Sequence, residues 1–84
     1  MSKMKTEYKY IYFEDKSSLY PKRKTAVWCC FNKSSHLMIA TIAWNGRWRQ
    51  YCFFPEKDTV FSSGCMDDII DFINQLKQLR NNKD

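Results

Sequence analysis

Arginine and aromatic side chains alternate in one short stretch of the chain. Trp44, Arg47, Arg49 and Tyr51 fall within eight consecutive residues, and a basic run lies upstream at 22–24. Aromatic rings can stack on nucleobases, and guanidinium and ammonium groups bind phosphate. We therefore predict a binding site for a phosphate-bearing ligand, a nucleic acid or a nucleotide, formed by Trp44, Arg47, Arg49, Tyr51, Lys22, Arg23 and Lys24.

A β-hairpin is the element that would position these side chains. Asn45-Gly46 separates two runs rich in β-branched and aromatic residues, which is typical of a two-residue type I′ turn with φ > 0 at both positions. The predicted strands are 37–44 and 47–54, and Pro55 ends the second because it has no N–H to donate. This register pairs Trp44 with Arg47, Ile42 with Arg49, Ala40 with Tyr51 and Met38 with Phe53.

The alternation of side chains leaves open which face of the hairpin is buried. One face carries the arginines with Trp44 and Tyr51, and the other carries residues such as Ile39, Cys52 and Phe54. Each face has enough apolar surface to form a core, and a slip of one residue would exchange them. The arginine-bearing face is therefore either a ligand surface or the edge of an aromatic core whose arginines reach water.

The remaining chain predicts an α+β fold. Alternating patterns predict strands at 7–13 and 25–31, and 59–61 is a possible short strand. Apolar residues at i, i+3, i+4, i+7 and i+10 from Met66 predict a helix over 66–79, with Asp67 and Asp68 in its first turn. We expect an antiparallel meander of about four strands packed by this C-terminal helix, in a single small domain over 1–84 whose ends, 1–6 and 81–84, are loose.

Composition restricts the class of protein. The 84 residues are 44% hydrophobic and 17% aromatic, which suits one folded domain and not a disordered chain. No apolar run approaches the ~20 residues of a membrane span and no signal peptide follows Met1, so we expect a cytoplasmic protein without a membrane partner. Residues 1–58 carry a net charge of +6 and residues 59–84 carry −1, which gives the chain its +5. This positive charge indicates either acidic or phosphate-bearing partners or simple solubility.

Few residues could support catalysis or bind a metal. Cys29 and Cys30 are adjacent and would point to opposite faces of a strand, there is no C-x₂-C pair, and the single histidine, His36, lies in a predicted loop. In a reducing cytosol, the cysteines are expected to be small buried hydrophobic residues. We expect no metal site, no cofactor and no catalytic residue, and therefore a protein that is not an enzyme.

Two resemblances involve the second predicted hairpin strand. The alternating aromatics of residues 49–54 resemble the central strand of RNA-recognition domains, but that family has Gly where Gln50 stands and a helix between its first two strands. We reject that fold and keep base stacking as a possible chemistry. The run Trp48–Pro55, followed by Thr59, Phe61, Cys65, Asp68-Ile69 and Phe72-Ile73, looks like a group of small uncharacterised bacterial and phage proteins over 37–76. This resemblance implies strands followed by a helix and a mobile-element setting, and no catalytic residues.

Two functions from different classes fit these observations. The first is a module that binds nucleic acid or a nucleotide on the arginine and aromatic face. The second is a protein-interaction module that occupies a host protein through an edge strand or an aromatic face. A homodimer fits either function. The positive charge coincides with the aromatic strands, which favours the first.

Overall fold

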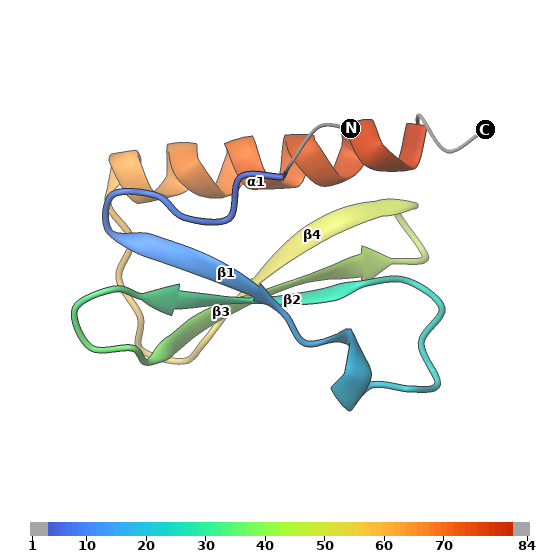
Figure 1. Ribbon diagram of the computed structural model, residues 1–84, viewed down its shortest axis with the longest axis horizontal. Helices are drawn as coiled ribbons and strands as arrows, with labels where there is room; N and C mark the ends of the chain where they lie inside the picture. Colours follow the sequence, from blue (N-terminus) through green and yellow to red (C-terminus); the bar gives the residue numbers. More distant parts are fainter. Residues whose placement is uncertain (1–3, 82–84) are drawn as a thin grey trace.

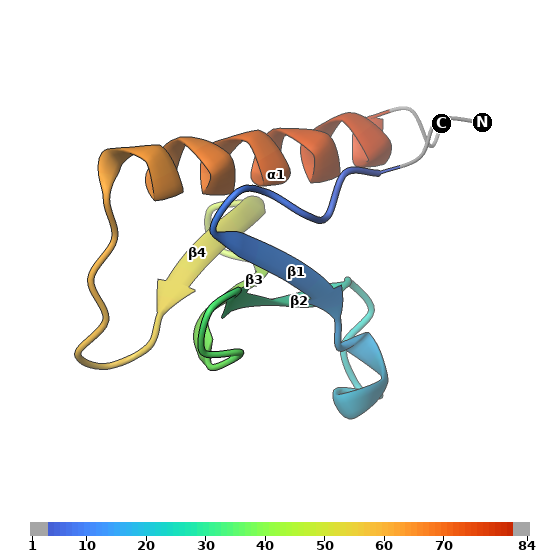
Figure 2. The ribbon, with the colours of Figure 1, turned by 60° about the vertical axis from the view of Figure 1, so that its left-hand side comes forward.

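The computed structural model describes residues 4–81, in which four strands and one long helix form two layers. The strands lie in one antiparallel sheet in the order β1-β2-β3-β4, and α1 crosses one face of it (Figures 1 and 2). The predicted α+β meander with a C-terminal helix is confirmed. In chain order the elements are β1 (Ile11–Asp15), the 3₁₀ turn η1 (Ser17–Leu19), β2 (Val27–Asn32), β3 (Met38–Asn45), β4 (Gln50–Pro55) and α1 (Ser63–Asn81).

The core lies between the sheet and α1. Phe13 of β1 stacks on Phe72 of α1, with ring centroids 3.9 Å apart, and Ile42 of β3 is fully buried beside them. Burying each such side chain contributes roughly 1.5–3 kcal/mol to folding. The same layer holds Tyr8, Ile11, Cys30, Ala40, Ile69 and Leu76.

The N-terminal strand begins later than the pattern of residues 7–13 predicts. The chain reverses before β1, with the Tyr8 N–H donating to the Ile11 carbonyl at 2.9 Å and the Phe13 N–H to the Thr6 carbonyl at 2.8 Å. The Tyr8 hydroxyl donates to Asp71 of α1 at 2.7 Å, so Tyr8 faces the helix while Tyr10 is exposed. The predicted alternation is therefore wrong here, because a contact distant in sequence outweighs the local pattern.

The predicted loose ends lie partly outside the described residues, at 1–3 and 82–84. Within the described part, the Lys5 N–H donates to the Gln75 side chain at 2.7 Å, and that side chain donates back to the Lys5 carbonyl at 2.9 Å. Lys5 and Thr6 are thus hydrogen-bonded to α1 and β1, and the looseness of the two ends stays a prediction.

The register of the β3–β4 hairpin differs from the predicted one. Asn45 pairs with Gln50, Trp44 with Tyr51 and Ile42 with Phe53, so the connection is the four-residue loop Gly46–Arg49 and not Asn45-Gly46. Relative to the predicted pairing, β4 is displaced along β3 by an even number of residues, so Trp44 and Tyr51 still lie on the same face of the sheet. That face is the one that α1 covers, because Ala40 and Ile42 on it are completely buried.

The segment before α1 is a loop and not the possible strand at 59–61. Asp58 adopts a φ of 62°, and the chain then leaves the sheet, so that Val60 is 95% exposed. The helix begins three residues before the predicted start because the Ser62 side chain accepts from the Cys65 N–H at 3.2 Å. Asp67 and Asp68 are therefore in the second turn. Residues 4–81 contain no helix that combines the length and apolarity needed to span a bilayer.

Candidate functional site

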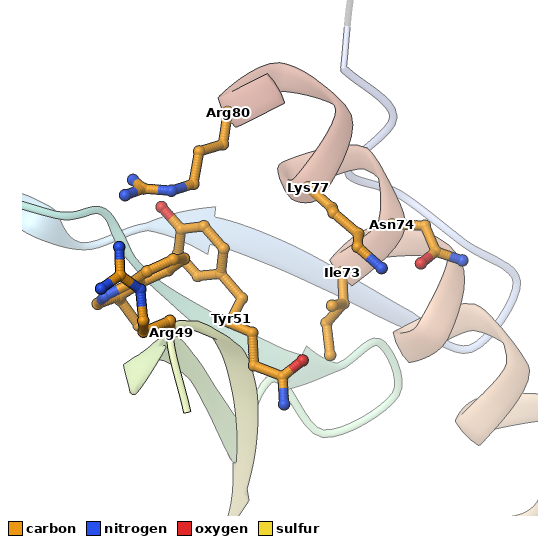
Figure 3. Close-up of a pocket in the computed structure, with 8 residues that line it drawn as sticks. Arg49, Tyr51, Ile73, Asn74, Lys77 and Arg80 are labelled. Atoms are coloured by element: carbon orange, nitrogen blue, oxygen red, sulfur yellow. The ribbon is translucent and has the colours of Figure 1, made fainter. Parts of the chain in front are cut away.

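A cavity of about 370 Å³ lies where the β3–β4 turn approaches the C-terminal half of α1. Its size is within the range of small-molecule binding sites. Figure 3 shows Arg80 and Arg49 reaching from these two elements to the same end of the cavity, beside Tyr51. We call this cavity the cationic site; its lining residues are Trp44, Arg49, Gln50, Tyr51, Ile73, Asn74, Lys77 and Arg80.

The turn geometry places Arg49 in the site. The Asn45 side-chain oxygen accepts from the backbone N–H groups of Arg47 and Trp48 at 3.0 and 3.1 Å, and the Arg49 N–H donates to the Asn45 carbonyl at 2.7 Å. Arg49 then takes a left-handed φ of 56°, whereas Gly46 does not have a positive φ. The turn is thus organised by the Asn45 side chain and not by the freedom of Gly46.

The β2–β3 turn uses the same geometry. Asn32 accepts from the Ser34 N–H at 2.8 Å, the His36 N–H donates to the Asn32 carbonyl at 2.7 Å, and His36 has a φ of 60°. An Asn followed four residues later by a left-handed residue therefore recurs at both turns. In both turns the side chain and the carbonyl of the first Asn accept the hydrogen bonds that close the loop.

The helix contributes two cations to the site. Ile73, Lys77 and Arg80 are spaced by four and three residues, so they lie along one face of α1. The Arg80 guanidinium lies 3.9 Å from the centroid of the Trp44 ring, and Tyr51 meets that ring edge-on at 5.3 Å between centroids. An aromatic face positions Arg80 here, which leaves its N–H groups able to bind an anion.

The charged side chains that line the site, among the described residues, are all positive. Among the described residues, none that lines the site is acidic, and the ion pairs found within residues 4–81, Lys16 with Glu14 and Lys33 with Glu7, lie elsewhere. The C-terminal end of α1 adds a partial negative charge of about half a unit, which the full charges of Arg49, Lys77 and Arg80 outweigh. The arrangement therefore suits an anionic ligand with an aromatic or planar part.

The seven residues predicted as the site are only partly brought together. Trp44, Arg49 and Tyr51 line the cavity, and Arg23 supports it by donating from Nη2 to the Trp44 carbonyl at 2.8 Å. Arg47 is exposed in the turn and does not line the cavity, and neither do Lys22 and Lys24, which are exposed in the loop before β2. The predicted pairs Trp44–Arg47 and Ile42–Arg49 do not form, because both arginines lie in the loop.

The sequence did not predict that residues of α1 line the site. The spacing of Ile73, Lys77 and Arg80 indicates a shared helix face, but no local signal says which end of the sheet that face meets. The second unpredicted contribution, from Gln50, follows from the true hairpin register, in which Gln50 opposes Asn45.

Thiols and the histidine are not part of the cationic site. Burial raises the pKa of the Cys30 thiol to about 12, and burial also raises the pKa of Cys29 on the other side of the sheet. His36 shares a hydrogen bond with the Tyr12 hydroxyl at 3.0 Å in the β2–β3 turn, at the opposite end of β3 from the site. Over residues 4–81, no three His, Cys, Asp or Glu side chains gather in a way that could hold a metal ion.

Comparison with known proteins identifies one relationship. No family model matches the chain, and no solved structure matches it significantly. The uncharacterised 9.3 kDa protein of Acholeplasma phage L2 is 33% identical over 61 residues, which are 73% of this chain and 78% of that protein. The resemblance to small phage proteins is thus confirmed, while the run Trp48–Pro55 as its signature stays a prediction. The chain belongs to a family of small phage proteins that includes the 9.3 kDa protein of Acholeplasma phage L2.

Proposed function

We propose that this protein is a small, non-enzymatic binding module that holds a phosphate-bearing ligand, a nucleic acid or a nucleotide, at the cationic site. The observation that carries the proposal is the convergence of Arg49, Lys77 and Arg80, from two separate elements, around Trp44 and Tyr51. Kinship with a phage protein favours a role in an infected cell, where the module would act in the host cytoplasm.

Each group has a defined role in this proposal. The two guanidiniums and the Lys77 ammonium bind phosphate oxygens through charge-assisted hydrogen bonds. Tyr51 and Trp44 provide aromatic surface for a base. Arg23 holds the backbone at the end of β3 and adds a further positive charge nearby.

The test is binding of a fluorescent single-stranded oligonucleotide and of a labelled nucleotide, followed by fluorescence anisotropy. We expect Arg49→Ala and Lys77→Ala to weaken binding by about tenfold or more each, since a hydrogen bond to a charged group contributes roughly 1.5–3 kcal/mol. Arg47→Ala is the matched control, because Arg47 lies in the same turn but outside the cavity.

Salt dependence gives a second readout. Losing one phosphate contact should reduce the slope of log affinity against log salt by about one. If Arg47→Ala weakens binding as much as Arg49→Ala, the attraction comes from overall charge and the site assignment fails. If neither probe binds the native protein at low salt, the proposed function fails.

A protein-interaction module, or a homodimer, is the alternative, and the sheet favours it on one point. The face away from α1 presents Phe54, which is 45% exposed, and Met38, which is 40% exposed, next to the edge strand β4. A partner could extend the sheet at that edge. A monomeric protein with no captured host partner under gentle conditions would count against this alternative.

A further inference from the structure

A second cavity, of about 400 Å³, adjoins the cationic site. Tyr51 and Arg80 line both cavities, so the two share a wall formed by these side chains. In contrast to the cationic site, the rest of the second lining is apolar. We call it the apolar cavity; its lining residues are Met4, Ala26, Trp28, Tyr51, Leu76, Leu79 and Arg80.

One polar atom of the apolar cavity's lining residues has no partner. The indole Nε1–H of Trp28 is buried and makes no hydrogen bond to any described residue. A buried donor without a partner costs roughly 1–3 kcal/mol. This nitrogen has almost no accessible surface, so an acceptor atom of a ligand contacts it only when the neighbouring side chains shift.

We propose that the two cavities together bind one nucleotide unit, with its base in the apolar cavity and its phosphate in the cationic site. The inference rests on the proposed function and specifies its ligand. The base is planar and apolar on its faces, which suits the aromatic walls of Trp28 and Tyr51. The phosphate is the complement of Arg49, Lys77 and Arg80.

The fold also restricts how much of a nucleic acid could enter. α1 lies across one face of the sheet (Figure 2), and Trp44 and Tyr51 are on that face, so successive bases cannot stack along it as they do on an open sheet. The ligand is therefore a free nucleotide or the terminal nucleotide of a strand. Both present the same chemistry, a base joined through a sugar to a phosphate.

The experiment measures affinities of the full chain by isothermal titration calorimetry for three kinds of probe. These are inorganic phosphate, the four common ribonucleosides, and the corresponding nucleoside 5′-monophosphates. We expect at least one monophosphate to bind tenfold or more tightly than both its nucleoside and inorganic phosphate, because it alone fills both cavities. A short oligonucleotide with and without a 5′-phosphate then distinguishes the terminal nucleotide of a strand from a free nucleotide.

Two variants address the apolar cavity. Trp28→Phe removes the N–H and keeps an aromatic ring, and Ala26→Leu reduces the cavity volume; each should weaken monophosphate binding by about tenfold and leave phosphate binding unchanged. Trp48→Phe is the matched control, since Trp48 is 64% exposed and lines neither cavity. Thermal unfolding establishes that each variant is folded.

The outcomes separate this inference from the proposed function. If phosphate-bearing probes bind and Arg49→Ala weakens them, but no monophosphate exceeds inorganic phosphate and both cavity variants behave as native, the inference is overturned and the proposed function stands. If no phosphate-bearing probe binds at low salt, both are overturned.

Discussion

The guanidinium of Arg80, in the last turn of α1, stacks over the Trp44 ring at the end of β3, 3.9 Å from its centroid. This contact joins the helix to the end of the sheet at the edge of the cationic site. Arg80 is exposed, so the interaction is expected to contribute about 0.5–1 kcal/mol to stability.

Replacing Arg80 should therefore affect stability as well as binding. We expect Arg80→Ala to lower the free energy of unfolding by about 0.5–1 kcal/mol in urea titrations, because the stacking on Trp44 is lost. Lys77→Ala is the control, as Lys77 lines the same cavity without an aromatic partner among the described residues. Equal losses in the two variants would show that the ring contact adds nothing.

The β3–β4 turn predicts an unusual response to mutation of its glycine. Gly46 lacks a positive φ, and a Cβ added there would meet no heavy atom within 4 Å. We expect Gly46→Ala to raise the free energy of unfolding by about 0.4–1 kcal/mol by restricting the unfolded chain. A two-residue type I′ turn predicts a loss instead, so destabilisation of Gly46→Ala would contradict the observed register.

Arg49, unlike Gly46, has the backbone conformation that favours glycine. Its left-handed φ of 56° costs a non-glycine residue roughly 1–2 kcal/mol. Arg49→Gly should therefore raise the midpoint of urea unfolding while abolishing the contribution of this side chain to ligand binding. Arg47→Gly, in the same turn without a positive φ, should not be stabilised. Comparing the two variants therefore distinguishes the effect of backbone strain at position 49 from the effect of removing a positive charge from the turn.

Tyr8 makes stability depend on alkaline pH. Burial, together with the hydrogen bond to Asp71, raises the pKa of Tyr8 well above its usual value of about 10. Above pH ~10 the folded state retains a Tyr8 proton that the unfolded state loses, so the contribution of Tyr8 to stability is complete below pH ~10 and is lost as the pH rises further. We expect Tyr8→Phe to flatten this decline in unfolding measurements at alkaline pH, whereas Tyr10→Phe, at an exposed position, should keep it.

The thiols should divide into two groups. Cys30 is completely buried with its pKa raised to about 12, and Cys29 is 5% exposed with a raised pKa, whereas Cys52 and Cys65 are partly exposed. Because the thiolate is the reactive form, an aromatic disulfide reagent should label Cys52 and Cys65 in the native protein and the other two only on unfolding. Rapid native labelling of Cys30, read by mass spectrometry, would contradict the buried position.

Local patterns in the sequence were sufficient for the fold class. The alternation within β2, β3 and β4 and the 3.6-residue period of α1 each depend on neighbouring residues, so the strands and the helix could be predicted to within a few residues. The identity of the aromatic and basic residues also indicated Trp44, Arg49 and Tyr51 as members of one site. Kinship with phage proteins was likewise visible in the sequence.

Only the tertiary structure decided which face of the hairpin is covered and which cations meet. Both faces carry apolar residues, and the choice depends on the packing of Ile42 and Phe13 against Phe72, a contact between distant parts of the chain. The hairpin register depends on the Asn45 side chain, whose hydrogen bonds select a four-residue loop and move Arg47 out of the site. Lys77 and Arg80 join the site because α1 lies across the sheet, and residues about thirty positions apart in sequence become neighbours only when the core has formed.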